Sequence, residues 1–236
     1  MFKNRQMHLT PELLTVVART VADPGPLPGT AILSDSDYVQ FVQDILATKP
    51  TDDIWIFGYG SLIWNPACDF VEQRLGVAHG WHRSFCMEMK RFRGSPEEPG
   101  LMMALDRGGV CKGMAYRLAA DTLEASLGKL FRREMTANPP PHRPRWLAIR
   151  TAEGPLRAIS FVMDRSSSRY IGGLAPEKVA EVLTKAAGHW GSGAEYLYST
   201  VQHLETLGIH DRQLWQLQKL VAEQIRTLSS GAARPK

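Results

Sequence analysis

The order of secondary-structure signals along the chain is the strongest constraint on its fold. Short apolar runs typical of strands lie between residues 54 and 163, and amphipathic helical patterns dominate after residue 176. Because the strand candidates precede the helix candidates instead of alternating with them, the pattern favours an α+β fold over a parallel βαβ sheet. The expected strands are 54–57, 84–89, 101–105, 110–118, 146–150 and 158–163, with a helix over 121–137 between them. Three helices are expected to follow, from Pro176, over 195–207 and from Asp211.

The first 50 residues have a different character from the rest. Thr10 and Pro11 suit the N-cap and first position of a helix, which the proline- and glycine-rich segment 23–30 then ends. A second amphipathic helix follows and stops at Pro50. We therefore expect an N-terminal helical extension and linker over 1–50, a main domain over 51–228 and a flexible tail over 229–236.

Composition narrows the class of protein. A hydrophobic fraction of 44% is ample for a core, and a net charge of +4 tolerates an anionic substrate but falls short of a nucleic-acid binder. The N-terminus lacks a signal peptide, and no stretch has the length of a membrane span. The three cysteines, Cys68, Cys86 and Cys111, form no CxxC pair. These features predict a reduced, cytoplasmic protein with no membrane or nucleic-acid partner and no thiolate metal site.

A glycine-rich turn follows the first expected strand, with the sequence Gly58, Tyr59, Gly60, Ser61, Leu62. Glycines allow successive backbone N–H groups to face one side, which suits a carboxylate or an oxyanion. An ordinary tight turn would have the same spacing. Ile63 stands where a dinucleotide fingerprint or a nucleophile elbow around Ser61 needs glycine, so the turn fits neither motif.

Glu134 lies on the apolar side of the helix expected over 121–137. Asp121 and Glu124 have the spacing of a capping box, and the apolar stripe includes Leu127 and Leu130. Glu134 comes seven places after Leu127, which puts it only about 20° from that stripe. A carboxylate facing an apolar interior must be paired, neutral or functional, because burial raises its pKa. Periodicity alone leaves an interior ion pair and an acid/base role open.

The turn and the glutamate together resemble the ChaC family of γ-glutamylcyclotransferases. The similarity spans about residues 54–225 and opens with the block WIFGYGSLIW from Trp55 to Trp64. It continues through RSF at Arg83, GMAYRL at Gly113, FRRE at Phe131, YIG at Tyr170 and EYL at Glu195. The opening block is the most specific part, and Glu134 stands at the family's catalytic glutamate.

The resemblance implies the fold, the reaction and a set of site residues. The fold would be a small mixed β-barrel with surrounding helices. The reaction would convert glutathione to 5-oxoproline and cysteinylglycine, with Glu134 as general acid/base and no metal or other cofactor. The implied substrate-binding residues are Gly58, Tyr59, Gly60, Ser61, Leu62 and Tyr170. The protein is expected to be a monomer or weak dimer.

Several alternatives stay open on the sequence. The chain could bind γ-glutamyl compounds without turnover, act on γ-glutamyl compounds other than glutathione, or use Ser61 or a cysteine as an amidase nucleophile. Tyr170 could be a packing residue. Arg93 could face the glycine carboxylate of glutathione, although a solvated loop arginine is the more economical interpretation. His79 and His82 lie three apart, and we interpret them as structural or surface residues.

Overall fold

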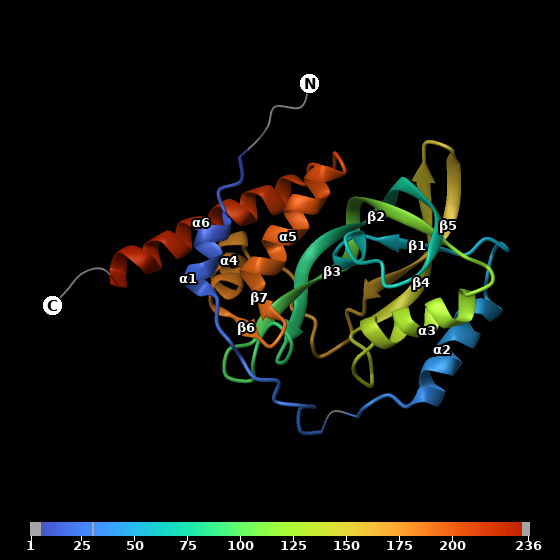
Figure 1. The fold of residues 1–236 in the computed structure, drawn as a ribbon, viewed down its shortest axis with the longest axis horizontal. Coiled ribbons are helices and arrows are strands. Elements are labelled where there is room, and N and C mark those ends of the chain that lie inside the picture. The colour runs from blue at the N-terminus through green and yellow to red at the C-terminus, as the bar shows by residue number, and fades with distance from the viewer. Residues whose placement is uncertain (1–5, 30, 233–236) are drawn as a thin grey trace. The chain divides into compact units, whose positions relative to one another are not determined.

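Five strands close into a barrel in the computed structural model, which describes residues 6–29 and 31–232 (Figure 1). Their order around the barrel is β1-β3-β2-β4-β5, and the parallel pairing of β1 with β5 closes it. The strands are β1 (Trp55–Gly58), β2 (Phe70–Met89), β3 (Gly100–Leu118), β4 (His142–Thr151) and β5 (Gly154–Met163). Since helices accompany this mixed barrel, the expected α+β fold is confirmed.

The chain divides into two compact units. The barrel unit consists of Pro28–Ser84 and Met103–Tyr170, and the helical unit consists of Met1–Leu27, Phe85–Met102 and Ile171–Lys236. Helix α1 (Pro11–Val17) belongs to the helical unit and α2 (Asp35–Ala47) to the barrel unit. The extension, main domain and tail inferred from the sequence stay a prediction, and residues 233–236 of that tail lie outside the described residues.

Strand β1 is buried on both of its faces. Trp55 and Phe57 pack with Leu105, Ala115 and other residues of the barrel strands. Ile56, which points the opposite way in a strand, packs in a second cluster with residues of α2 and α3. Two covered faces explain why β1 reads as a continuous apolar run without polar alternation.

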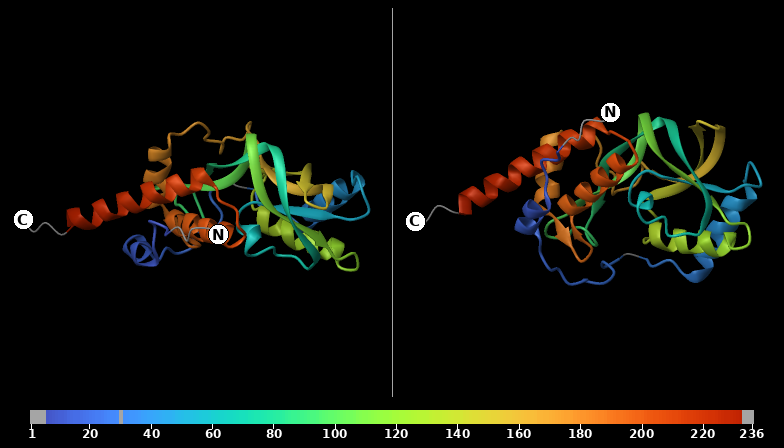
Figure 2. Two further views of the ribbon diagram at one scale, coloured as in Figure 1. Left: turned by 90° about the horizontal axis from the view of Figure 1, so that it is seen from above. Right: turned by 45° about the horizontal axis from the view of Figure 1, so that its top comes forward.

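Helices α2 and α3 contribute to that second cluster and pack against each other (Figure 1; Figure 2, right). α2 begins at a capping box in which Ser34 and Asp37 exchange side-chain and backbone hydrogen bonds. α3 (Leu123–Glu134) buries Leu127, Leu130 and Phe131. The capping box expected at Asp121 and Glu124 was wrong: the N-cap of α3 is Thr122, and its side chain makes no capping hydrogen bond.

The strands are longer than their sequence patterns indicated. β2 begins at Phe70 and not near residue 84. The sequence pattern did not indicate its first half, because those residues are largely exposed and lack apolar alternation. The two strands expected over 101–105 and 110–118 form one strand, β3. Gly108 and Gly109 lie between them with φ values of 105° and 68°, a backbone region that glycine adopts readily, and the strand continues past this irregularity.

The helical unit is built around α6 (Arg212–Ala232). α1, α4 (Pro176–Lys185) and α5 (Gly193–Thr206) pack against it, and a short hairpin of β6 (Ala187–Gly188) and β7 (Gly191–Ser192) lies between α4 and α5 in the chain. Thr10 caps α1 and Pro11 opens it, as the sequence predicts. The buried side chain of Gln218 on α6 accepts a hydrogen bond of 2.8 Å from the backbone N–H of Leu9.

Candidate active site

The glycine-rich turn leads from β1 into a short 3₁₀ helix, η1 (Ser61–Ile63). The N–H of Ile63 donates to the carbonyl of Gly60, so the N–H groups of Ser61 and Leu62 precede the first hydrogen bond of this helix. A Cβ on Gly58 would lie 3.1 Å from the Cβ of Leu62. Glycine at position 58 therefore allows the chain to fold back closely onto Leu62, where a larger residue would be crowded.

The side chains of the turn are held by the barrel and by α3. The hydroxyl of Tyr59 donates to the carbonyl of Phe161 at 3.0 Å, and the carbonyl of Tyr59 accepts from Nε of Arg83 at 2.6 Å. Leu62 is buried in the cluster that includes Phe131 of α3. The turn is thus anchored on both sides.

Glu134 is the last residue of α3, and its side chain is only 19% exposed. Burial raises the pKa of this carboxyl above its ordinary value, and the positive charge of Arg133 opposes that shift. A carboxylate with a raised pKa is a stronger base and a useful proton carrier near neutral pH. The apolar position inferred from helical periodicity therefore corresponds to a desolvated carboxyl group.

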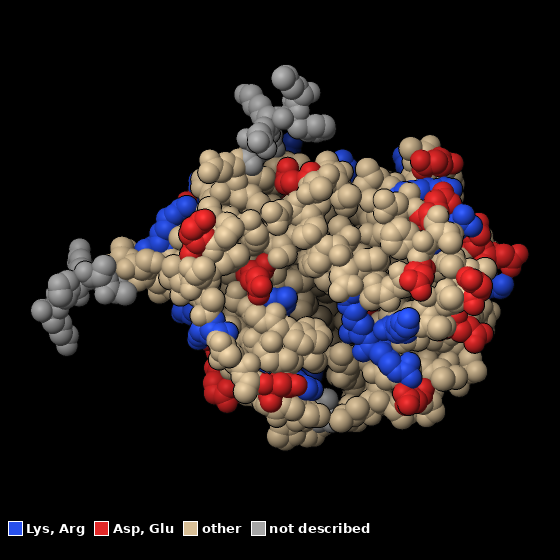
Figure 3. Space-filling model, in the orientation of Figure 1, with Lys and Arg blue, Asp and Glu red and all other residues tan. Residues whose placement is uncertain are grey.

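Arg133 connects Glu134 to the turn. Its Nη2 donates to Oγ of Ser61 at 2.9 Å, its Nη1 donates to the carbonyl of Asn65, and its Nε lies 3.3 Å from Oε1 of Glu134. Figure 3 shows Lys and Arg side chains gathered over α3, where Arg132 and Arg133 form the last turn. One guanidinium group thus holds together the two features that the sequence singled out.

Arg133 is a functional candidate that the sequence pattern does not indicate. Helical periodicity separates Arg133 from the apolar stripe and gives no reason to select it over Arg132. The two differ in their partners, because Arg132 pairs with Asp35 at the start of α2 at 2.7 Å. Only the folded position of η1, which lies 72 positions before Arg133 in the chain, distinguishes them.

His142 is a second residue that the sequence did not indicate. It is buried at the start of β4, and its ring packs edge-on against Phe161 with centroids 5.5 Å apart. Burial lowers the pKa of His142 to about 4, although a hydrogen bond with the backbone of Glu134 acts in the opposite direction. Within the described residues its Nε2 has no hydrogen-bond partner. A neutral imidazole therefore borders the backbone of Glu134.

Tyr170 is held by a different set of residues. Its hydroxyl donates to Oδ2 of Asp106 on β3 at 3.0 Å, and the guanidinium of Arg165 lies 5.7 Å from its ring. Ser61, by contrast, is joined to Glu134 through Arg133. The structure thus connects the glycine turn with Glu134, while Tyr170 is fixed at Asp106.

Arg93, in the helical unit, is not a solvated loop arginine. Its Nη1 donates to the carbonyl of Ser192 at 2.9 Å and lies 3.5 Å from Oε2 of Glu195, and its guanidinium stacks over Tyr196. Its side chain is 18% exposed. Its role toward a glycine carboxylate stays a hypothesis.

The comparisons with known proteins decide the family. The chain matches the ChaC-like protein family over residues 54–224. The chain belongs to that family. A glutathione-specific γ-glutamylcyclotransferase of Escherichia coli is 39% identical over 80% of this chain and 83% of its own length. The mouse glutathione-specific γ-glutamylcyclotransferase 1 is 29% identical over 66% of this chain and 71% of its own length.

The ChaC-like fold is also found among solved structures. A yeast γ-glutamylcyclotransferase described as specific to glutathione superposes with a TM-score of 0.66 at 19% identity, covering 73% of this chain and 97% of the yeast chain. That likeness supports the barrel-and-helix fold. Membership of the ChaC-like family therefore agrees with both the sequence match and the architecture.

The nucleophile alternatives have unfavourable surroundings in this ChaC-like protein. Oγ of Ser61 accepts a hydrogen bond from a cation, which lowers its nucleophilicity instead of activating it. Burial raises the pKa of the Cys68 thiol to about 11, so the reactive thiolate is scarce near neutral pH. Cys86 and Cys111 are buried.

The described residues form neither a metal centre nor a membrane-spanning helix. No three His, Cys, Asp or Glu side chains within 6–29 and 31–232 come together as a metal site requires. Over the same ranges, no helix has both the length and the apolar character needed to cross a membrane.

Proposed function

We propose that this ChaC-like protein is a cofactor-free glutathione-specific γ-glutamylcyclotransferase. The observation that carries the proposal is the link between the glycine turn and a desolvated carboxyl group: Arg133 contacts both Ser61 and Glu134. The relatives from Escherichia coli and mouse, which carry that activity in their names, support the choice of glutathione. We further propose that the enzyme is cytoplasmic, acts as a monomer or weak dimer, and needs neither a membrane nor a nucleic acid.

The reaction is an intramolecular transfer of the γ-glutamyl carbonyl. Glu134 accepts a proton from the α-ammonium group of glutathione, and the freed amine attacks the γ-carbonyl carbon. A new C–N bond forms as the carbonyl π pair moves onto oxygen. When the carbonyl re-forms, the bond to the cysteinyl nitrogen breaks, and Glu134 returns its proton to that nitrogen. The attacking nitrogen, which is positively charged after the attack, loses its second proton to become the neutral lactam N–H, and the released amine takes up that proton as an ammonium group. The products are 5-oxoproline and cysteinylglycine.

The proposed roles of the substrate and of the site residues follow from the geometry. Because nucleophile and electrophile belong to one molecule, the site has to fold the γ-glutamyl group and move protons from the attacking nitrogen to the leaving nitrogen. Well-oriented intramolecular attack reaches effective molarities of about 10⁵ M or more. The backbone N–H groups of Ser61 and Leu62 suit the oxyanion or the α-carboxylate of the γ-glutamyl group. Gly58, Tyr59 and Gly60 shape this turn, and Tyr170 is proposed to contact the substrate.

Substrate scope is tested by comparing glutathione with γ-glutamyl dipeptides. Purified protein is incubated with each compound, and 5-oxoproline is measured by mass spectrometry. We expect kcat/KM for glutathione to exceed that for γ-glutamylalanine by at least about tenfold, the discrimination that a few extra contacts to the cysteinylglycine half supply. Equal values would point to a general γ-glutamyl cyclotransferase. No product from any of them would leave a non-catalytic binding protein.

A further inference from the structure

A cavity lined with arginines lies in the barrel unit, and its lining includes neither a residue of the glycine turn nor Glu134. Its volume is about 410 Å³, within the range of about 300–1,000 Å³ typical of small-molecule sites. The lining of this arginine cavity includes Trp81, Arg107, Arg143, Arg145, Asp164 and Arg165. They come from β2, β3, β4 and the segment after β5, and none of them belongs to the proposed active site.

The charge of the arginine cavity is strongly unbalanced. Four guanidinium groups face one carboxylate, that of Asp164. Hydrogen bonds from Ser166 are the main cause of the lowered pKa of Asp164, so this carboxylate is ionised at neutral pH. The lining side chains thus carry a formal charge of +3, since four arginines contribute +4 and Asp164 −1, and the carboxylate of Asp106, which pairs with Arg165 behind the lining, leaves a surplus of +2. Such a surplus favours an anion with more than one negative charge.

Two of the arginines are held in place by carboxylates. Nε of Arg143 lies 2.8 Å from Oδ2 of Asp164, and Nε of Arg165 lies 2.7 Å from Oδ1 of Asp106. Asp106 is buried, which by itself raises its pKa, but hydrogen bonds from Arg165, Arg107 N–H and Tyr170 outweigh this and leave the pKa lowered. Arg165 also donates to the carbonyl of Arg107 at 3.1 Å. This part of the wall is therefore ordered before any ligand arrives.

The other two arginines have their guanidinium groups available. In the described part of the chain, no carboxylate lies within ion-pair distance of Arg107 or Arg145. Arg145 follows Arg143 by two positions on β4, so both point to the same face of the strand. A guanidinium fork without an acceptor is suited to bidentate pairing with phosphate oxygens.

We propose that the arginine cavity binds a small organic phosphate of about mononucleotide size. A phosphate monoester carries about −1.5 to −2 charges at neutral pH and a diphosphate more, which matches the surplus better than one carboxylate does. Trp81 is half-buried against the barrel core and adds an aromatic wall beside the arginines. Aromatic rings of this kind stack on nucleobases. Arg107 and Arg145 bind the phosphoryl oxygens, and Arg143 and Arg165 orient the charge.

The test is isothermal titration calorimetry with ADP and with inorganic pyrophosphate, in 150 mM salt and without glutathione. Both probes are expected to bind with Kd below about 100 µM, and Arg107→Gln and Arg145→Gln are each expected to weaken binding about tenfold. Arg150→Gln is the matched control, because Arg150 is an exposed arginine of β4 that does not line the cavity. It should change Kd less than about twofold.

Three results would overturn the proposal. One is the absence of measurable binding of either probe up to millimolar concentration. Another is an equal loss in Arg150→Gln and Arg107→Gln, which would mean that the charge of the whole surface acts without a site. The third is binding of the dicarboxylate succinate as tight as that of pyrophosphate, which would exclude recognition of phosphoryl groups. Circular dichroism of each variant shows whether it is folded.

Discussion

At the scale of single residues, Arg133 has two effects on the proposed site. Its guanidinium fixes Ser61 and Asn65, and its charge counteracts the rise in the pKa of Glu134. These effects can be separated, because lysine keeps the charge and loses the fork, whereas glutamine loses both. Arg133 is thus a positioning residue whose electrostatic part can be read from a pH profile.

For Arg133→Gln we expect the acidic limb of kcat/KM against pH to move to higher pH. Removing a nearby cation disfavours the carboxylate, so the pKa of Glu134 rises further and a higher pH is needed to ionise it. Arg133→Lys should keep the limb within about half a pH unit of wild type while lowering kcat, since a point charge cannot bridge Ser61 and Asn65. A limb that moves to lower pH in Arg133→Gln would contradict this account.

The raised pKa of Glu134 also has a cost in stability. A folded-state pKa above the unfolded value contributes stability at low pH, and that contribution is lost as pH rises through the folded pKa. Glu134→Gln removes this loss, so we expect the variant to have a higher Tm than wild type at pH 7.5. The difference should shrink below pH 4.5. A lower Tm of the variant at pH 7.5 would show that the carboxylate stabilises the fold.

The contribution of His142 to stability depends on pH in the opposite sense to that of Glu134. Its pKa falls from 6.5 to about 4 in the folded protein, chiefly because the ring is buried. The contribution to stability is present above pH 6.5 and is lost as pH falls toward 4, because the unfolded chain binds the proton first. The full loss corresponds to about 3 kcal/mol. Between pH 7 and pH 4.5, His142→Phe should lose less free energy of unfolding than wild type does, as measured by urea denaturation. If the free energy of unfolding falls by the same amount in both proteins, this assignment is refuted.

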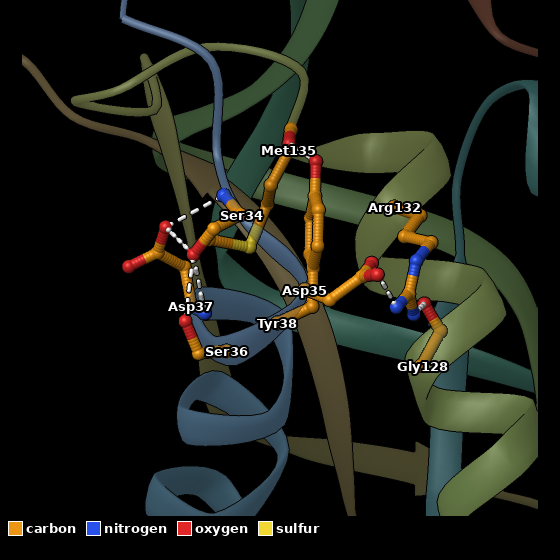
Figure 4. Close-up of polar contacts among 8 residues, drawn as sticks. All are labelled: Ser34, Asp35, Ser36, Asp37, Tyr38, Gly128, Arg132 and Met135. Carbon is orange, nitrogen blue, oxygen red and sulfur yellow. Dashed lines mark hydrogen bonds and ion pairs between the residues drawn. The ribbon is translucent and has the colours of Figure 1, made fainter.

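At the scale of elements, α2 is fixed to α3 by a few polar contacts at its first turns (Figure 4). The hydroxyl of Tyr38 donates to the carbonyl of Met135, the C-cap residue of α3, at 2.9 Å. Arg132 of α3 pairs with Asp35 and lies over the Tyr38 ring. Met135 directly follows Glu134, so the contact of Tyr38 supports the end of the helix that carries the proposed catalytic carboxyl.

We expect Tyr38→Phe to destabilise the protein by about 1 kcal/mol, the usual contribution of one hydrogen bond whose acceptor loses its donor. Gln40→Ala is the control, because Gln40 is exposed on the same helix and its side chain donates to Asp44 one turn later. It should change the free energy of unfolding by less than about 0.5 kcal/mol. Urea denaturation measures the free energy of unfolding of both variants. Equal decreases would mean that the hydrogen bond from Tyr38 to Met135 adds no measurable stability.

Helices and strands with a clear hydrophobic period or capping signal were predicted well from the sequence, and those without such a pattern were not. α1 follows from Thr10 and Pro11, and α3 follows from its apolar stripe. The start of β2 could not be inferred, because its early residues are exposed and carry no alternation. The ion pair of Glu134 with Arg133 and the hydrogen bond of Arg133 to Ser61 depend on tertiary proximity, which no local pattern encodes. Glu134 could thus be predicted as the catalytic candidate from the sequence, whereas the residues that contact it could be identified only from the fold.

At the scale of the whole molecule, the N-terminal helices serve different units. α1 packs on α6 in the helical unit, while Val42 and Ile45 of α2 are buried in the cluster that contains Phe131. The family match begins only at residue 54, yet Val42 and Ile45 of α2 are buried in the same core as Leu127 and Phe131 of the matched region. The two helices should therefore respond differently to truncation.

Deleting residues 1–27 should leave a folded protein with a lowered Tm, because the barrel unit keeps all of its core. Deleting residues 1–50 also removes Leu33, Val42 and Ile45, each worth about 1.5–3 kcal/mol when buried, so cooperative unfolding should be lost. Differential scanning calorimetry of the two truncated chains tests this. A 51–236 chain that unfolds cooperatively near the wild-type Tm would show that α2 is dispensable.

The central claim is that Glu134 carries the proton in a cyclotransferase reaction. It is tested most directly by measuring 5-oxoproline formed from glutathione by wild type, Glu134→Gln and Glu124→Gln. Glu124 is an exposed glutamate in the first turn of the same helix and serves as the matched control. We predict a fall in kcat of about 10²- to 10⁴-fold for Glu134→Gln and less than about twofold for Glu124→Gln. Wild-type rates in a folded Glu134→Gln protein would contradict the claim.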